Sequence, residues 1–208
     1  MGFVNTADLI GDDALVNSII DRTITEIADN QIKIIGSYSF SHCTALKNAD
    51  FRAAIEIRNY AFSESGIESA NFPMATTVRS DAFNSCRSLI SINIPAATNL
   101  YQDAFYYCSK LTSIDLPVVS SIGKNAFNRC SQLKSIILRN SAVATLGGTN
   151  AFTSTPIASG TGYIYVPRAL ADSYKAATNW STYAAQFRAL EDYTVDGTIT
   201  GALDPNKI

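Results

Sequence analysis

The sequence has few charged residues and a single histidine, His42. Charged residues make up 16% of the 208 positions, against about 25% in an average globular chain. The 16 Lys and Arg nearly balance the 18 Asp and Glu, with a formal net charge of -2, so nothing in the composition attracts nucleic acid. One histidine also removes most histidine-based metal sites and catalytic constellations. These absences argue against an enzyme and against a nucleic-acid partner.

Long apolar runs and chemical motifs are also missing. No stretch approaches the roughly 18 to 20 apolar residues of a membrane helix, and residues 1–8 lack the basic flank and apolar run of a secretory signal. The sequence contains no nucleophile elbow, H-E-x-x-H motif or phosphate-binding glycine loop. We therefore predict no membrane insertion, no signal peptide in this chain, and no catalytic residue, metal site or cofactor. With 47% hydrophobic residues, the chain is expected to form one mid-sized soluble domain.

A set of phenylalanines recurs at a nearly fixed spacing. Its members are Phe40, Phe62, Phe83, Phe105, Phe127 and Phe152. The intervals are 22, 21, 22, 22 and 25 residues, which is too regular for chance. A period of this length indicates a repeat architecture and has to be recognised before single elements are assigned.

Other positions repeat together with the phenylalanines. Six residues after the Phe, a leucine opens an L-x-x-I-x-L pattern, as in residues 111–116. The alternation over its last three positions predicts a short strand with one buried face, and a proline such as Pro117 ends it because proline has no N–H to donate. In the second copy Ile67 comes one residue early, which places the missing residue between Phe62 and Ile67.

One repeat of about 22 residues cannot bury its own Phe, Leu and Ile side chains. Stacking the repeats at the spacing of neighbouring strands, about 4.8 Å, creates a continuous core and a parallel sheet along one side. Six such coils predict a rod roughly 25 to 30 Å long.

The repeat resembles a known family. Residues 122–138 and 100–117 show best the pattern I-G-x-x-A-F-x-x-C-x-x-L-x-S-I-x-L-P, which looks like the BspA-type leucine-rich repeat. Residues 163–190 are in addition similar to the terminal segment that closes such arrays in bacterial and bacteriophage proteins. The resemblance implies a curved solenoid used for binding in adhesins, surface proteins and phage-associated proteins. The predicted fold class is an α/β repeat solenoid, a leucine-rich-repeat right-handed coil with a parallel sheet on one face and helical caps.

Four segments are expected along the chain. Residues 1–33 form an N-terminal cap with a short helix, residues 34–167 form an array of about six 22-residue coils, residues 168–190 form a C-terminal helical cap, and residues 191–208 form a polar tail. A solenoid needs such caps because its ends otherwise expose apolar surface. The sixth coil is atypical, since it stretches to 25 residues and contains inserted glycines.

Both flanks show apolar residues at helical spacing. Residues 12–21 predict a short amphipathic helix over the first coil. At the other end Leu170, Tyr174 and Ala177 share one helix face, and residues 180–190 suggest a second. The Thr, Val and Ile alternation in the tail is consistent with a hairpin or with a strand added to a partner.

The four cysteines occupy one register of the repeat. Cys43, Cys86, Cys108 and Cys130 each follow the Phe by three residues. Their spacings of 43, 22 and 22 do not match those of zinc ligands. Neighbouring turns bring two thiols close enough for a disulfide on distance alone, but the pattern is typical of buried thiols that act as small hydrophobes. His42 shares its register with Ser85, Tyr107 and Arg129, so we expect it to be an exposed coil residue.

The outward side chains of the sheet are the first candidate binding surface, because alternate strand residues form a regular, rigid array. The candidates are Asp50, Asn71, Asn93, Asp115 and Ile137, with Tyr163 and Tyr165 extending the sheet at its C-terminal end. A second candidate patch consists of Tyr101, Tyr106 and Tyr107. The alternative interpretation is that the polar row is merely solvated and that the tyrosines are partly buried in the coil.

These features predict a non-enzymatic binding module that recognises a protein or glycan through its exposed sheet face, in adhesion or host attachment. The alternative is a structural spacer or assembly component of a bacteriophage particle or larger complex, which makes its contact through residues 191–208. The family resemblance implies a cell-surface, secreted or virion-associated location.

Overall fold

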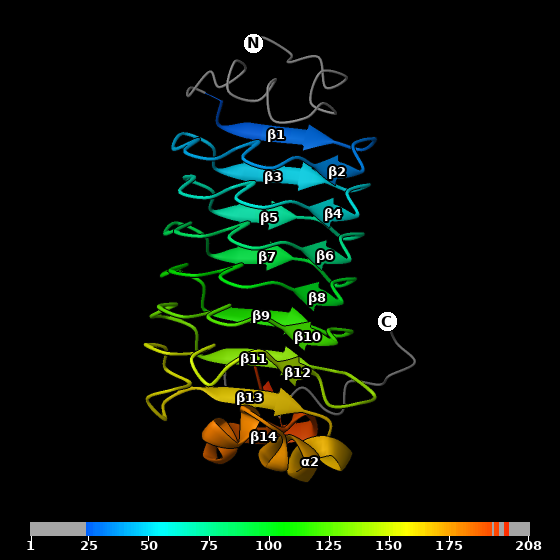
Figure 1. Ribbon diagram of the computed structural model, residues 1–208, viewed down its shortest axis with the longest axis vertical. Helices are drawn as coiled ribbons and strands as arrows, with labels where there is room; N and C mark the ends of the chain where they lie inside the picture. Colours follow the sequence, from blue (N-terminus) through cyan, green and yellow to red (C-terminus); the bar gives the residue numbers. More distant parts are fainter. Residues whose placement is uncertain (1–23, 193, 196–197, 200–208) are drawn as a thin grey trace.

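The computed structural model describes residues 24–192, 194–195 and 198–199. Each sequence repeat forms one turn of a parallel-sheet solenoid, and about seven turns stack along the long axis (Figure 1). The expected helix at residues 12–21 lies outside the described residues. Helix content in the described part is low, so the α of the expected α/β class is confined to the C-terminal end.

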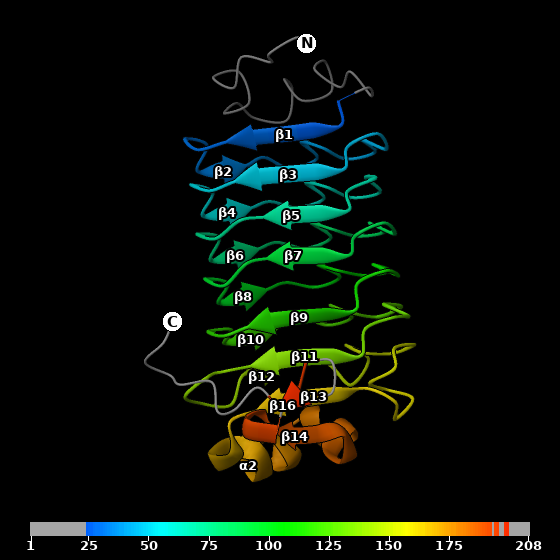
Figure 2. The same ribbon diagram turned by 180° about the vertical axis from the view of Figure 1, so that it is seen from behind.

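Two columns of short strands run along the stack and are visible from both sides (Figures 1 and 2). The first column contains β1 (Glu26–Asp29), β3 (Asn48–Phe51), β5 (Ser69–Asn71), β7 (Ser91–Asn93), β9 (Ser113–Leu116), β11 (Ser135–Leu138) and β13 (Tyr163–Val166). The second contains β2 (Ile34–Ile35), β4 (Glu56–Ile57), β6 (Thr77–Val78), β8 (Asn99–Leu100), β10 (Ser121–Ile122) and β12 (Thr145–Leu146). The first column is the parallel sheet predicted from the L-x-x-I-x-L pattern.

The two columns differ in continuity. The second is one six-stranded sheet, whereas the first divides between β7 and β9 into β1-β3-β5-β7 and β9-β11-β13-β14, the last strand being β14 (Phe187–Ala189). Each second-column strand has two residues, which is too short to produce a recognisable alternation in the sequence.

The repeat phenylalanines form a single column of stacked rings through the core. Successive ring centroids lie 5.0 to 5.6 Å apart, and from Phe62 to Phe152 neighbouring planes are within 4° of parallel. Phe105, for example, is fully buried between Phe83 and Phe127. Offset stacks of this kind add about 0.5 to 1.5 kcal/mol per pair to the burial of the rings, so this column is a main source of stability.

The backbone around each Phe adopts a repeated conformation that links the turns. The residues two before and two after the Phe have φ near +60° in most turns, and these include Asp103 and Tyr107 around Phe105. The Phe105 N–H donates to the carbonyl of Ala126 at 2.9 Å, and the Tyr107 N–H donates to Asn128 at 2.8 Å. Such hydrogen bonds to the next turn offset the cost of left-handed conformations in residues other than glycine.

The short second turn depends on a glycine. Gly66 lies within the interval that lacks one residue, and its N–H donates to the Cys43 carbonyl at 3.0 Å. A Cβ atom at this position would lie 1.9 Å from the carbonyl oxygen of Thr44. The short turn therefore brings its backbone so close to the preceding turn at Gly66 that no side chain fits there.

The stack begins before the expected boundary at Ile34. Strand β1 pairs with β3 in parallel, with Glu26 opposite Asn48 and Asp29 opposite Phe51. The solenoid therefore extends into the segment expected to form the N-terminal cap.

The C-terminal end is closed by residues 168–190, as Figure 1 shows at the bottom of the stack. It contains the 3-10 turn η2 (Arg168–Leu170), the helix α2 (Ala171–Ala176), the 3-10 segment η3 (Trp180–Gln186) and β14, followed by the 3-10 turn η4 (Leu190–Asp192). The expectation of a second helix face over residues 180–190 holds only over residues 180–186, which form the 3-10 segment η3 with Trp180 and Tyr183 buried. From Phe187 on it is wrong, because residues 187–189 form a strand beside β13.

Side chains of this cap bind the open backbone groups of the last turn. Trp180 Nε1 donates to the Ala144 carbonyl at 2.7 Å, and the Ala144 N–H donates to the Tyr174 hydroxyl at 3.0 Å. Asn179 Nδ2 donates to the carbonyl of Leu146 at 2.6 Å. These groups flank and include β12, the terminal strand of the six-stranded sheet, so the cap replaces the hydrogen bonds that a further turn would make.

The tail contains the antiparallel strands β15 (Thr194–Val195) and β16 (Thr198–Ile199). The hairpin alternative for the tail is therefore confirmed over these four residues.

Candidate functional site

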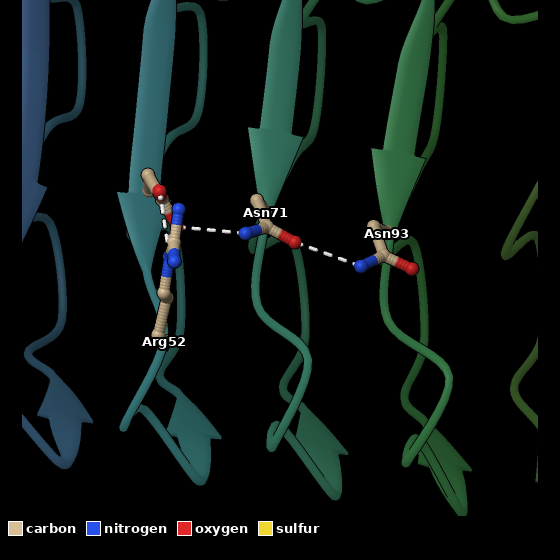
Figure 3. A network of polar contacts seen from close by, with 4 residues as sticks. Arg52, Asn71 and Asn93 are labelled. Carbon is tan, nitrogen blue, oxygen red and sulfur yellow. Dashed lines mark hydrogen bonds and ion pairs between the residues drawn. The ribbon is translucent and has the colours of Figure 1, made fainter. Parts of the chain in front are cut away.

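A ladder of polar side chains crosses the outward face of the first sheet (Figure 3). Asn71 Nδ2 donates to Asp50 Oδ1 at 2.7 Å, and Asn93 Nδ2 donates to Asn71 Oδ1 at 2.7 Å. Arg52 closes the ladder at the Asp50 end, with Nε 3.0 Å from Oδ2. Since Asp50 pairs with Asn71, and Asn71 with Asn93, in the parallel register, the sheet itself sets their spacing. Three predicted residues, Asp50, Asn71 and Asn93, are thus brought together.

A second polar row lies beside this ladder. Asn48 Nδ2 donates to Glu26 Oε1 at 3.1 Å, and the Ser69 hydroxyl donates to Asn48 Oδ1 at 2.6 Å. Ser91 continues the row as an exposed residue. The two rows make the face of the β1-β3-β5-β7 sheet a surface of fixed hydrogen-bonding groups.

The predicted row does not continue unchanged beyond Asn93. Strands β7 and β9 belong to different sheets, and Asp115 forms an ion pair with Arg139, whose Nη2 lies 2.8 Å from Oδ2. Ile137 occupies the outward register beside Asp115 but is 6% exposed, so it differs from the expected solvent-facing contact. Burial removes Ile137 from the candidate surface.

The two tyrosines of β13 are half-buried. Tyr163 pairs with Ser135 and Tyr165 with Ile137 in the parallel register, and their rings lie 6.4 Å apart. The guanidinium carbon of Arg188 lies 4.3 Å from the Tyr163 ring centroid. These residues extend the sheet as predicted, but they are separated from the ladder by Asp115 and the buried Ile137.

The second candidate patch divides into two places. The 40% exposed Tyr101 contacts Arg79, whose guanidinium carbon is 5.0 Å from the ring centroid and whose Nε donates to Glu56 at 2.7 Å. This hydrogen bond raises the pKa of Arg79.

Tyr106 and Tyr107 form the other part of the patch, with ring centroids 6.3 Å apart. The guanidinium carbon of Arg87 is 4.4 Å from the Tyr107 centroid, and that of Arg129 is 5.8 Å from both rings. Neither arginine was among the predicted site residues. The shared register of Tyr107 and Arg129 already places them in neighbouring turns, whereas Arg87 occupies another position of the repeat and gave no such signal.

The cysteines form the buried column predicted from their register. All four are buried and none forms a disulfide. The Cys86, Cys108 and Cys130 thiols donate to the carbonyls of Phe62, Phe83 and Phe105 in earlier turns, at 2.9 to 3.1 Å. Burial raises the pKa of Cys86 to about 12 and raises the pKa of Cys108 well above its ordinary value. Buried thiols of this kind are poor nucleophiles, because the reactive species is the thiolate.

In the described part of the chain, no three His, Cys, Asp or Glu side chains are grouped so that they could hold a metal ion. His42 is exposed, as predicted, and its Nδ1 lies 3.6 Å from a carboxylate oxygen of Glu64. No helix of the described residues is long and apolar enough to cross a membrane.

Two solved structures illustrate what this chain is similar to. A leucine rich cell surface protein from Faecalibacterium prausnitzii A2-165 superposes with a TM-score of 0.50 at 19% identity, over 83% of this chain and 52% of that one. A leucine-rich repeat protein from Bacteroides ovatus ATCC 8483 gives a TM-score of 0.30 at 17% identity, over 70% of this chain and 56% of that one. This chain thus spans about half the length of either protein. No curated protein matches it.

A family match covers most of the sequence. The BspA type leucine rich repeat region matches residues 2–89 and 55–164, with six copies. Together these matches cover more than half of the 208 residues, including the turns that carry the polar ladder. The chain therefore belongs to the BspA-type leucine-rich-repeat family.

Proposed function

We propose that this chain is a non-enzymatic binding module that recognises a protein or a glycan through the outward face of the β1-β3-β5-β7 sheet. The observation that carries the proposal is the hydrogen-bonded ladder of Asp50, Asn71 and Asn93. The proposed setting is adhesion or host attachment at a bacterial or virion surface. The similar F. prausnitzii protein is described as a cell surface protein, which supports a surface location.

The ladder suits binding because its side chains are already held in place. The side-chain amides of Asn71 and Asn93 each donate one N–H to the neighbouring residue of the ladder, so their second N–H can donate to a ligand. Asn93 is exposed, and no side chain of the described residues donates to its amide oxygen. Preorganised side chains lose little rotamer entropy when a ligand binds, and peptide groups and sugar hydroxyls both offer matching donors and acceptors.

The test is a binding screen of the intact chain against glycans and host-surface proteins, followed by an Asn71→Ala and Asn93→Ala double variant. Asn99→Ala is the matched control, because Asn99 is a partly exposed asparagine of the second column that accepts a hydrogen bond from Ser121. We expect the double variant to weaken binding of a ligand from the screen by about tenfold or more, which corresponds to about 1.4 kcal/mol, while the control binds normally. If the double variant and the control bind the ligand with equal affinity, the ligand does not bind at the ladder.

The spacer alternative makes a different prediction about the tail. Deletion of residues 191–208 should leave ligand capture by the sheet face unchanged. If the deletion abolishes assembly into a larger particle and the intact chain captures no ligand, the spacer function replaces the binding function.

A further inference from the structure

One edge of the solenoid concentrates positive charge. We call it the basic edge and define it as residues 84–92, 106–114 and 128–136, the segments that lead from the Phe column into β7, β9 and β11 in three consecutive turns. These segments contain no Asp or Glu, and their four cationic residues, all exposed, are Arg87, Lys110, Arg129 and Lys134. A chain of net charge -2 thus carries a local charge of +4 on this edge.

The same edge is not positive in the first two turns, where the one Lys and two Glu give a formal charge of -1 with His42 neutral. There His42 lies 3.6 Å from Glu64, and Lys47 Nζ lies 2.9 Å from Glu68. The positive charge of the basic edge is therefore a property of three particular turns and not of the repeat itself.

Two arginines of the basic edge have no anionic partner among the described residues. Arg52, Arg58, Arg79, Arg139 and Arg168 each pair with a carboxylate. By contrast, the guanidinium groups of Arg87 and Arg129 take part in none of the ion pairs or hydrogen bonds between described residues, and they contact the rings of Tyr106 and Tyr107. Their guanidinium N–H groups are thus available to a ligand.

The tyrosines hold these two arginines close to each other. Both guanidinium carbons lie within 6 Å of the Tyr107 centroid, so they are at most about 10 Å apart. Tyr107 and Arg129 start from backbone positions fixed by hydrogen bonds to the next turn, Tyr107 N–H to Asn128 and Arg129 N–H to Thr153, both at 2.8 Å. The cations therefore project from a rigid scaffold.

We propose that the basic edge binds an acidic polysaccharide, with Arg87 and Arg129 contacting its anionic groups. The cations are distributed over three turns spaced about 4.8 Å apart, which suits an extended polymer with repeated anions. Each of the three segments also contains at least two serines, whose hydroxyl oxygens can accept hydrogen bonds from sugar hydroxyls. The overall charge of -2 disfavours nucleic acid, whose charge density is higher.

The test measures binding of the full chain to dextran sulfate, with uncharged dextran as the matched polymer and hyaluronate as a carboxylated one. An Arg87→Gln and Arg129→Gln double variant removes the two unpaired guanidinium groups. Arg168→Gln with Lys175→Gln is the control, because it removes two exposed cations at the C-terminal cap that are paired with Asp192 and Asp172. Thermal melting of each variant verifies that it is folded.

We expect dextran sulfate, and not dextran, to bind the wild-type chain. The double variant should lose about tenfold or more in affinity and show a smaller dependence on salt, whereas the control should change by less than about twofold. Comparing hyaluronate with dextran sulfate distinguishes carboxylate from sulfate as the preferred anion.

Three results would overturn the proposal: no binding of either acidic polysaccharide, an equal loss in the control, or equal or tighter binding of polyglutamate or single-stranded DNA. The Asn71→Ala and Asn93→Ala variant should bind dextran sulfate normally. Failure of the sheet-face site and failure of the basic edge are therefore measured separately.

Discussion

The column of stacked phenylalanines makes a strong quantitative prediction for Phe105→Ala. Phe105 is fully buried, and its centroid lies 5.2 Å from that of Phe83 and 5.4 Å from that of Phe127. Burying a Phe side chain removes about 150 to 250 Å² from water, or roughly 4 to 6 kcal/mol at about 25 cal/mol per Å². Alanine keeps part of this, so the net loss should be about 3 to 5 kcal/mol, the range observed for such cavities.

The assay is urea unfolding followed by circular dichroism, which reports the sheet, and by the fluorescence of Trp180, which lies in the cap. Phe105→Leu is the matched control, since it keeps most of the buried apolar volume but loses both ring stacks, and it should cost about 1 to 2 kcal/mol. Tyr101→Ala, in the same turn at a 40% exposed position, should cost less than about 1 kcal/mol.

A loss below about 1 kcal/mol for Phe105→Ala would refute the stacked core. A stacked column also implies energetic coupling between neighbouring rings. A double-mutant cycle of Phe105 with Phe127 should deviate from additivity by about 0.5 kcal/mol or more, whereas the cycle of Phe105 with Phe40, three turns away, should be additive.

Further predictions concern the cap, the short turn and the thiols. Trp180→Phe should cost about 1 to 3 kcal/mol in thermal or urea unfolding, because it leaves the buried carbonyl of Ala144 without its donor, and an unchanged stability would show that the cap bond is dispensable. Gly66→Ala should reduce stability by more than the same change at the exposed Gly147, whose would-be Cβ lies 2.8 Å from backbone, since at Gly66 the distance to Thr44 is 1.9 Å. Folding raises the pKa of Cys86 from 9.0 to about 12, so the folded state favours the neutral thiol. The resulting contribution to the free energy of unfolding is complete below pH 9 and is lost as the pH rises from about 9 to 12. The free energy of unfolding should therefore fall less between pH 8 and pH 10.5 in Cys86→Ala than in the wild type. Above pH 9 the two proteins should diverge by up to about 1.4 kcal/mol per pH unit, and an equal fall in both would contradict the buried thiol.

The sequence predicted those features that depend on the repeat period. The spacing of Phe40 to Phe152 was sufficient to predict stacked turns, a buried cysteine column and a parallel sheet, because stacking brings residues one period apart into contact. The ladder of Asp50, Asn71 and Asn93 follows from the same register. Each of these features requires only that a residue face the same way in every turn.

Features that depend on contacts between different columns were not predictable in this way. The first sheet column is interrupted between β7 and β9, and no pattern in the sequence predicts this interruption. The burial of Ile137 and the ion pair of Asp115 with Arg139 both occur next to it. In the cap, the apolar spacing of residues 180–190 fitted a helix, but only residues 180–186 are helical, because pairing of residues 187–189 with β13 outweighed the local preference there.

The C-terminal cap also bears on how copies of the chain behave toward one another. A terminal strand with open N–H and C=O groups is a template on which another chain can pair edge to edge. Because Tyr174, Asn179 and Trp180 bind the backbone groups around β12, this edge of the six-stranded sheet is closed to a second copy. The same hydrogen bonds that finish the fold thus keep the rods from polymerising end to end through this sheet.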